Sequence, residues 1–122
     1  MFHGLRTAKY EAQDLAAAKA WYNKVLGIAL YFDQPFYVGF NVGGYELGIV
    51  PAKGAGPKRA PSGIAYWAVT DAKKAYARLL ELGATPVEEI QDVGGDILIG
   101  EVHDPFGNVL GVNENPHFEA NK

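Results

Sequence analysis

The sequence contains no cysteine, no long apolar stretch and no run of lysine or arginine. Without cysteine, a disulfide framework, a thiolate nucleophile and a thiolate-ligated metal are all excluded. Because no segment has the length of a membrane span and no apolar segment follows the first residues, we expect a cytoplasmic protein with no membrane partner. The 14 acidic and 11 basic residues are spread along the chain, which argues against nucleic acid as a partner.

An internal repeat organises the chain. Asp14–Gly27 and Asp71–Gly83 each read as a helix that begins at a capping aspartate and ends at a glycine. Apolar residues recur at helical spacing in both, so each helix needs an apolar surface to cover. The repeat and the length of 122 residues predict one domain, residues 1–122, with module one at about 1–50, a proline- and glycine-rich linker at about 51–62, and module two at about 63–115.

The segments around each helix read as short strands, one before it and three after it. The predicted turns include Asp33–Pro35 and the pair Gly43-Gly44. The predicted strands lie near Gly4–Glu11, Ile28–Phe32, Phe36–Val42, Tyr45–Val50, Gly63–Val69, Pro86–Asp92, Ile97–His103 and Val109–Asn113.

Two motifs inside this repeat resemble those of a known family. Trp21–Gly27 is similar to its aromatic-Tyr…Leu-Gly helix end, and Asp104–Asn108 is similar to its Asp-Pro-x-Gly-Asn turn. The chain therefore resembles the glyoxalase/bleomycin-resistance/dioxygenase superfamily, also called the vicinal oxygen chelate superfamily. The resemblance implies an α+β fold in which two tandem βαβββ modules form curved mixed sheets around a cavity. It also implies a homodimer.

In that superfamily a divalent metal is commonly held by four side chains, one from the first and one from the last strand of each module. The matching positions in this sequence are Thr7, Glu46, Ile64 and Gly111, and only Glu46 is a usual ligand. Isoleucine and glycine offer no side-chain donor atom. We therefore expect no cofactor, with a divalent metal on a divergent ligand set as the alternative.

Strand alternation predicts which side chains share the cavity face with those positions. The expected ligand-binding residues are Thr7, Lys9, Glu11, Glu46, Tyr66, Ile99, Glu101 and Asn113. Simpler explanations stand beside this one: Lys9, Glu11 and Glu46 can form exposed ion pairs, His103 can be solvated at the rim, and Tyr66 can be a packing residue. The glycines Gly48 and Gly111 mark either a bend in the sheet or room for a ligand.

Two functions follow from the resemblance, and the sequence does not decide whether the protein is an enzyme. The first is binding of a small-molecule ligand without a metal, for which an aromatic and partly polar cavity is suited. The second is an enzyme, a lyase, isomerase or dioxygenase, with Glu46, Glu101 and His103 as the candidate catalytic residues. A module that senses a metabolite through the same pocket is a third reading.

Overall fold

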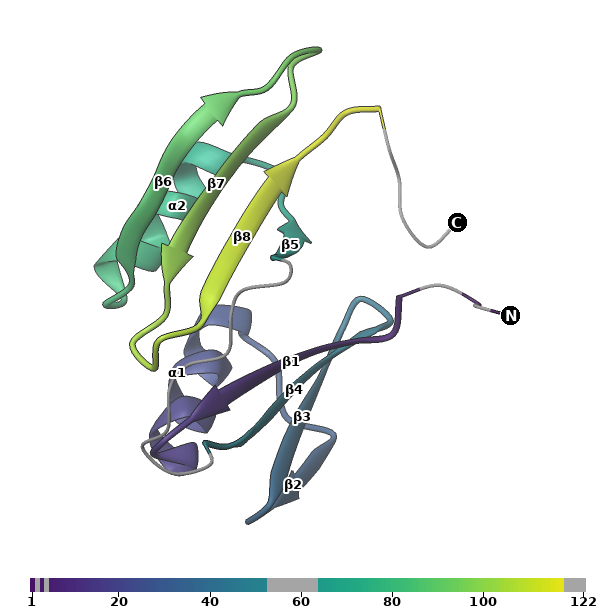
Figure 1. Cartoon of the computed structure of the whole chain (residues 1–122), viewed down its shortest axis with the longest axis vertical. Helices are drawn as coiled ribbons and strands as arrows, with labels where there is room; N and C mark the ends of the chain where they lie inside the picture. Colours follow the sequence, from purple (N-terminus) through teal and green to yellow (C-terminus); the bar gives the residue numbers. More distant parts are fainter. Residues whose placement is uncertain (2, 4, 53–63, 118–122) are drawn as a thin grey trace. The chain divides into compact units, whose positions relative to one another are not determined.

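The computed structural model describes residues 1, 3, 5–52 and 64–117. The chain divides into two compact units, Met1–Pro57 and Lys58–Lys122, and each is described by itself. Both units have the same element order, strand, helix and three strands (Figure 1). No helix within the described residues is long and apolar enough to cross a membrane.

The first unit holds one helix and a four-stranded sheet. Its elements are β1 (Thr7–Ala12), α1 (Leu15–Leu26), β2 (Phe32–Gln34), β3 (Tyr37–Val42) and β4 (Tyr45–Pro51). The strand order is β1-β4-β3-β2, with β1 parallel to β4 and the other pairs antiparallel.

The second unit repeats this arrangement. Its elements are β5 (Ala65–Ala68), α2 (Ala72–Glu81), β6 (Thr85–Asp92), β7 (Leu98–His103) and β8 (Val109–Glu114). The strand order is β5-β8-β7-β6, with β5 parallel to β8. The predicted α+β fold of two βαβββ modules with mixed sheets is confirmed.

Local capping fixes where the helices begin and end. The Asp14 carboxylate accepts a hydrogen bond of 3.0 Å from the Ala17 amide, and Asp71 does the same for the Lys74 amide at 3.0 Å. Gly27 ends α1 in the left-handed conformation at φ 66°. In α2 the last helical residue is followed by Leu82, and Gly83 then takes the positive φ of 109°.

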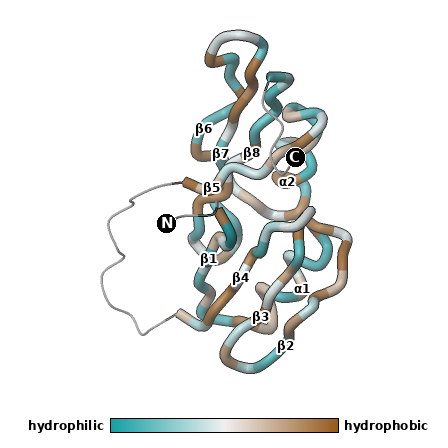
Figure 2. The backbone as a smooth tube through the Cα atoms, turned by 90° about the vertical axis from the view of Figure 1, so that its right-hand side faces the viewer, coloured by the Kyte–Doolittle hydropathy of each residue, from teal (hydrophilic) through white to brown (hydrophobic). Residues whose placement is uncertain are grey.

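Each helix covers one face of its own sheet. We refer to this face as the helix face and to the opposite one as the open face. Strand alternation sends the apolar side chains to the helix face, and Figure 2 shows hydrophobic and hydrophilic segments interleaved along both sheets. The buried residues of the two helix faces are Tyr10, Ala12, Val38, Phe40, Leu47 and Ile49 in the first sheet and Val102, Leu110 and Val112 in the second.

One strand prediction is wrong in position. The segment 28–31 is not a strand, and β2 instead contains Asp33, which was predicted to lie in a turn. Gln34 pairs with Tyr37, so the turn consists of Pro35 and Phe36. Proline cannot donate to a sheet ladder but suits a turn with its fixed φ, and the turn begins at Pro35 instead of at Asp33.

The predicted linker lies mostly outside the described residues, at 53–62, as do the predicted strand starts at positions 4 and 63. Pro51, which was assigned to the linker, belongs to β4, where it stands opposite Ala12. The next amide, that of Ala52, donates to the Ala12 carbonyl at 2.8 Å. The sheet of the first unit therefore includes Pro51.

Candidate functional site

Glu46 is the centre of a hydroxyl cluster on the open face of the first sheet. β4 places it directly opposite Thr7 of β1, and the Thr7 hydroxyl donates to Glu46 Oε1 at 2.8 Å. The Tyr37 hydroxyl donates to the same oxygen at 2.8 Å, and the Tyr31 hydroxyl donates to Oε2. A carboxylate can accept about four such bonds, so three donors occupy most of its capacity.

Two glycines make room for the tyrosine side chains of this cluster. A Cβ atom added to Gly48 would lie 2.1 Å from the Tyr37 hydroxyl oxygen, and one added to Gly39 would lie 3.0 Å from the Tyr31 ring. Neither glycine needs a positive φ. The sequence suggested a bend in the sheet or room for a ligand at Gly48, whereas in the structure the Tyr37 side chain occupies the space beside this glycine.

A shallow hollow lies beside the cluster. It has a volume of 220 Å³, and its lining residues are Arg6, Tyr31, Asn41, Gly44, Tyr45 and Glu46. The Tyr31 side chain remains 59% exposed although its hydroxyl is bound, so its ring is available to a ligand. The hollow thus combines aromatic surface with a carboxylate and a guanidinium group.

The second unit carries a smaller version of the same arrangement. Tyr66 of β5 and Glu101 of β7 both stand opposite Gly111 of β8 in the sheet register. The Tyr66 hydroxyl reaches across β8 and donates to Glu101 Oε2 at 2.5 Å. A Cβ atom on Gly111 would lie 2.4 Å from the Tyr66 ring and 3.0 Å from the Ala65 carbonyl oxygen. Gly111 therefore supplies the space through which Tyr66 reaches Glu101.

The surroundings of Tyr66 favour its neutral form. Its pKa is raised to about 12, first because its hydroxyl donates to Glu101, then because of partial burial and the negative charges of Glu101 and Glu88. Glu88 stands opposite Glu101 in the register of β6 and β7. The pKa of Tyr76, on the helix side, is also raised, mainly by burial and then by the charges of Glu89, Glu88 and Glu101.

Replacing Glu101 with glutamine is expected to lower the pKa of Tyr66 from about 12 toward its ordinary value of 10.0. The change removes a charge and weakens the hydrogen bond that holds the hydroxyl proton. Because the folded-state pKa is the higher one, the stability that this pair contributes is complete below pH 10.0 and is lost as the pH rises through about 12. Tyrosinate absorbance during an alkaline titration measures the shift, with Tyr66→Phe identifying the signal. An unchanged titration in Glu101→Gln would contradict the assignment.

The other residues predicted from alternation lie on the expected faces. Lys9 and Glu11 share the open face with Thr7, whereas their neighbours Tyr10 and Ala12 are buried on the helix face. Within the described part of the chain, the side chains that donate to the Glu46 carboxylate are hydroxyl groups, so the simpler explanation of an ion pair between Lys9 and Glu46 does not describe this carboxylate.

In the second unit, Ile99 and Asn113 stand opposite each other, and Ile99 shares its face with Glu101 and His103. His103 is exposed at the end of β7. Ile64 lies just before β5 and is 39% exposed, and the residue opposite Gly111 is Tyr66 rather than Ile64. In the first module the two matched positions, Thr7 and Glu46, stand opposite each other, whereas in the second the partner of Gly111 lies two residues after Ile64. A shift of two residues keeps the side chain on the same face of the sheet.

Sequence reasoning missed Tyr31 and did not single out Tyr37. Tyr37 lies two residues before Gly39 on β3, and the predicted strand contained both residues, so alternation along it places Tyr37 on the open face with Gly39. Tyr31 lies outside the regular strands, and its amide donates to the Gly39 carbonyl at 3.1 Å. Because side chains alternate between the two faces only within a strand, this rule does not predict where the Tyr31 side chain points.

The donor chemistry at the four matched positions does not suit a resident divalent metal. Thr7 offers a weak hydroxyl donor, Ile64 and Gly111 offer none, and Glu46 is hydrogen-bonded to three hydroxyl groups. Zinc sites normally take three or more strong protein ligands, and other transition metals likewise favour imidazole, thiolate or carboxylate ligands. Across residues 1, 3, 5–52 and 64–117, no group of three or more histidine, aspartate or glutamate side chains is placed to hold a metal ion.

Comparison with known proteins supplies the family context. The family described as Glyoxalase/Bleomycin resistance protein/Dioxygenase superfamily matches residues 7–112. None of the curated proteins compared with the chain matches it.

Solved structures share the fold at low sequence identity. A glyoxalase-related enzyme from Fulvimarina pelagi aligns with a TM-score of 0.79 and 19% identity, covering 98% of this chain and 94% of that one. Lactoylglutathione lyase from Agrobacterium tumefaciens aligns with a TM-score of 0.71 and 23% identity over 98% of this chain and 100% of its own. The fosfomycin resistance protein FosX from Mesorhizobium loti gives a TM-score of 0.72 at 13% identity, with 96% of each chain covered.

Proposed function

Because the chain belongs to the glyoxalase/bleomycin resistance protein/dioxygenase superfamily, we propose that it uses the open faces of its sheets to bind a small molecule, without the superfamily's metal. Binding is the primary activity in this proposal, and no bond of the ligand is broken. The fold hosts several chemistries, so the proposal depends on the site rather than on the fold.

The observation that carries the proposal is that hydroxyl groups already occupy the Glu46 carboxylate. This is the one matched position with a usual metal-ligating side chain, and its two oxygens accept hydrogen bonds from Thr7, Tyr31 and Tyr37. A metal would have to displace these donors and would find no side-chain donor atoms at the matched positions Ile64 and Gly111. The hydroxyl cluster instead holds the carboxylate in one orientation, as a fixed acceptor beside an aromatic surface.

The exposed rings indicate the kind of ligand. Tyr31 is 59% exposed and Tyr66 is 40% exposed, and each hydroxyl is anchored to a carboxylate. Anchored rings lose little conformational entropy when a flat molecule stacks on them. We therefore propose a planar or largely apolar ligand with a few hydrogen-bonding groups.

The alternative is an enzyme in which Glu46, Glu101 and His103 take part in acid–base chemistry. Such chemistry at Glu101 would involve the Tyr66 hydroxyl, which donates to this carboxylate. However, a hydroxyl with a pKa of about 12 is a weak proton donor at neutral pH. The same contact therefore fits a binding surface better than a proton-transfer pair.

The superfamily resemblance also leads us to propose a homodimer. Closed two-fold dimers are the commonest assemblies of soluble proteins. The molar mass of the full chain in solution tests this point. A mass near twice 13.2 kDa is expected, and a mass of 13.2 kDa across the accessible concentration range would contradict it.

The binding proposal is tested with three planar aromatic probes, one cationic, one neutral and one anionic, measured by ligand-observed NMR with the full chain. We expect at least one probe to bind equally well in chelator and in added divalent metal. Glu46→Gln should weaken the binding of that probe by ~10-fold, the effect of losing one charge-assisted hydrogen bond. Tyr31→Phe should also weaken it, because the ring is then no longer anchored to the carboxylate. Lys24→Gln, on the exposed surface of α1, is the matched control. Binding that requires added metal would contradict the proposal.

A further inference from the structure

A second hollow lies on the helix side of the first unit, away from the Glu46 cluster. Val38 contributes to it from β3, and its register partner Ile49 is buried under α1, whereas Glu46 projects from the opposite face of the same sheet. The hollow has a volume of 380 Å³. Its lining residues are Leu15, Ala16, Lys19, Asp33, Gln34, Pro35 and Val38.

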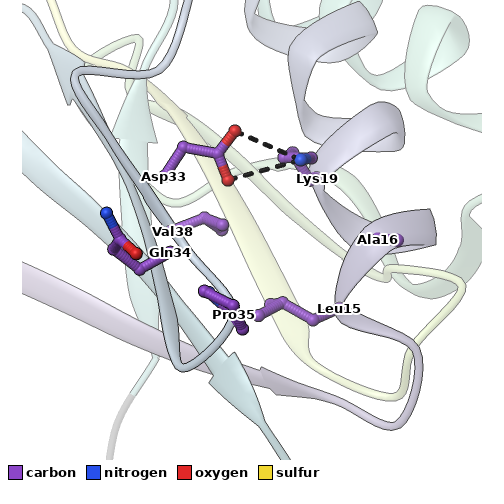
Figure 3. A pocket seen from close by; sticks show the side chains of 7 residues that line it. All are labelled: Leu15, Ala16, Lys19, Asp33, Gln34, Pro35 and Val38. Carbon is purple, nitrogen blue, oxygen red and sulfur yellow. Dashed lines mark hydrogen bonds and ion pairs between the residues drawn. The ribbon is translucent and has the colours of Figure 1, made fainter.

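The hollow has an apolar part and a charged part. Figure 3 shows Leu15, Pro35 and Val38 side by side between the first turn of α1 and the hairpin of β2 and β3. Beside them, Lys19 of α1 and Asp33 of β2 face each other. The Lys19 Nζ atom lies 3.3 Å from Asp33 Oδ1 and 3.2 Å from Oδ2. An apolar recess thus adjoins one positive and one negative group.

The ion pair can be replaced by a ligand without burying a bare charge. The Lys19 and Asp33 side chains are 37% and 50% exposed, and exposed ion pairs contribute little to stability. A ligand that carries both an anion and a cation can pair with both residues at once. A ligand with one charge can pair with only one of the two residues, and it has to compete with the other residue for that partner.

We propose that this hollow binds a small zwitterion with adjacent ammonium and carboxylate groups and an apolar side chain, that is, an α-amino acid or a molecule of similar form. The carboxylate pairs with Lys19 and the ammonium group with Asp33. The apolar side chain lies against Leu15, Pro35 and Val38. The volume is near the lower end of ligand pockets, about 300 Å³, and suits a ligand of this size.

The proposal is tested on the unaltered full chain with L-leucine, N-acetyl-L-leucine and L-leucinamide as probes. N-acetylation removes the cation, and amidation removes the anion, while the side chain stays the same. Backbone amide shifts of Lys19, Asp33 and Val38 report on binding. We expect L-leucine to shift them saturably and each analogue to bind at least ~10-fold more weakly, the effect of losing one hydrogen bond between charged groups.

Two variants examine the charged residues separately. Lys19→Met and Asp33→Asn should each reduce L-leucine binding by ~10-fold or more. Lys24→Met removes an exposed lysine from the same helix outside the hollow, and it should leave L-leucine binding unchanged. If L-leucine shifts none of these amides, or if it and the two analogues bind equally, the proposal is wrong. The analogue series requires no substitution, so a variant that fails to fold does not affect the test.

Discussion

Replacing Gly111 with alanine is expected to destabilise the protein by about 2 kcal/mol, within the range for overpacking a filled site. The added Cβ atom would lie 2.4 Å from the Tyr66 ring and 3.0 Å from the Ala65 carbonyl oxygen. The backbone cannot yield easily, so the ring must leave β8 and its hydrogen bond to Glu101. The free energy of unfolding in denaturant measures the loss, and the pKa of Tyr66 should fall from about 12.

A double-mutant cycle separates this explanation from a general intolerance of strand residues at position 111. In a Tyr66→Ala background the ring is absent, so Gly111→Ala should lower the free energy of unfolding by less than about 1 kcal/mol. The effects of two substitutions are non-additive in this way when the two residues are in contact. If Gly111→Ala has the same cost with and without Tyr66, the glycine is required for another reason, such as sheet geometry. The proposed role of Gly111 as space for Tyr66 would then be wrong.

Replacing Asp104 with alanine should cost about 3 kcal/mol, because a buried carboxylate that satisfies several donors is removed. Asp104 is 3% exposed. Its Oδ1 atom accepts from the Phe106 and Asn108 amides at 2.9 and 2.8 Å, and Oδ2 accepts from Asn108 Nδ2 at 2.7 Å. The turn joins the strands that carry Glu101 and Gly111, so its loss should also disturb the Tyr66 hydrogen bond.

Asp104→Asn is the matched control for this prediction. Its amide oxygen can still accept from the two backbone amides while the bond from Asn108 Nδ2 is lost, so we expect less than half of the alanine cost. The free energy of unfolding of both variants checks the order. Equal losses would show that the negative charge, rather than the turn's hydrogen bonds, supplies the stability.

The parts of the fold that depend on local chemistry were predictable from the sequence. The capping aspartates Asp14 and Asp71 and the glycine Gly27 specify helix ends through their own hydrogen bonds and dihedral angles. The alternation of strands β1 and β7 likewise assigned Thr7 and Glu101 to the open faces, because side chains change face at every residue.

The contacts that define the site were less predictable because they depend on long-range pairing. The apolar run 28–32 has the composition of a strand, but the fixed backbone of Pro35 selects a hairpin that leaves Tyr31 outside it. Which hydroxyls reach Glu46 depends on the register of β3 with β4 and on the glycines at 39 and 48. No local pattern indicates that a glycine in one strand serves a tyrosine in another.

Calorimetric titration of divalent metals into the metal-free full chain tests most directly whether Glu46 serves as a hydrogen-bond acceptor instead of a metal ligand. Zn²⁺, Ni²⁺ and Mn²⁺ are each titrated into the unaltered chain and into Glu46→Gln. We predict no saturable one-to-one binding that depends on Glu46, with the same heats in both proteins. Stoichiometric binding of any of these metals that disappears in Glu46→Gln would contradict the account.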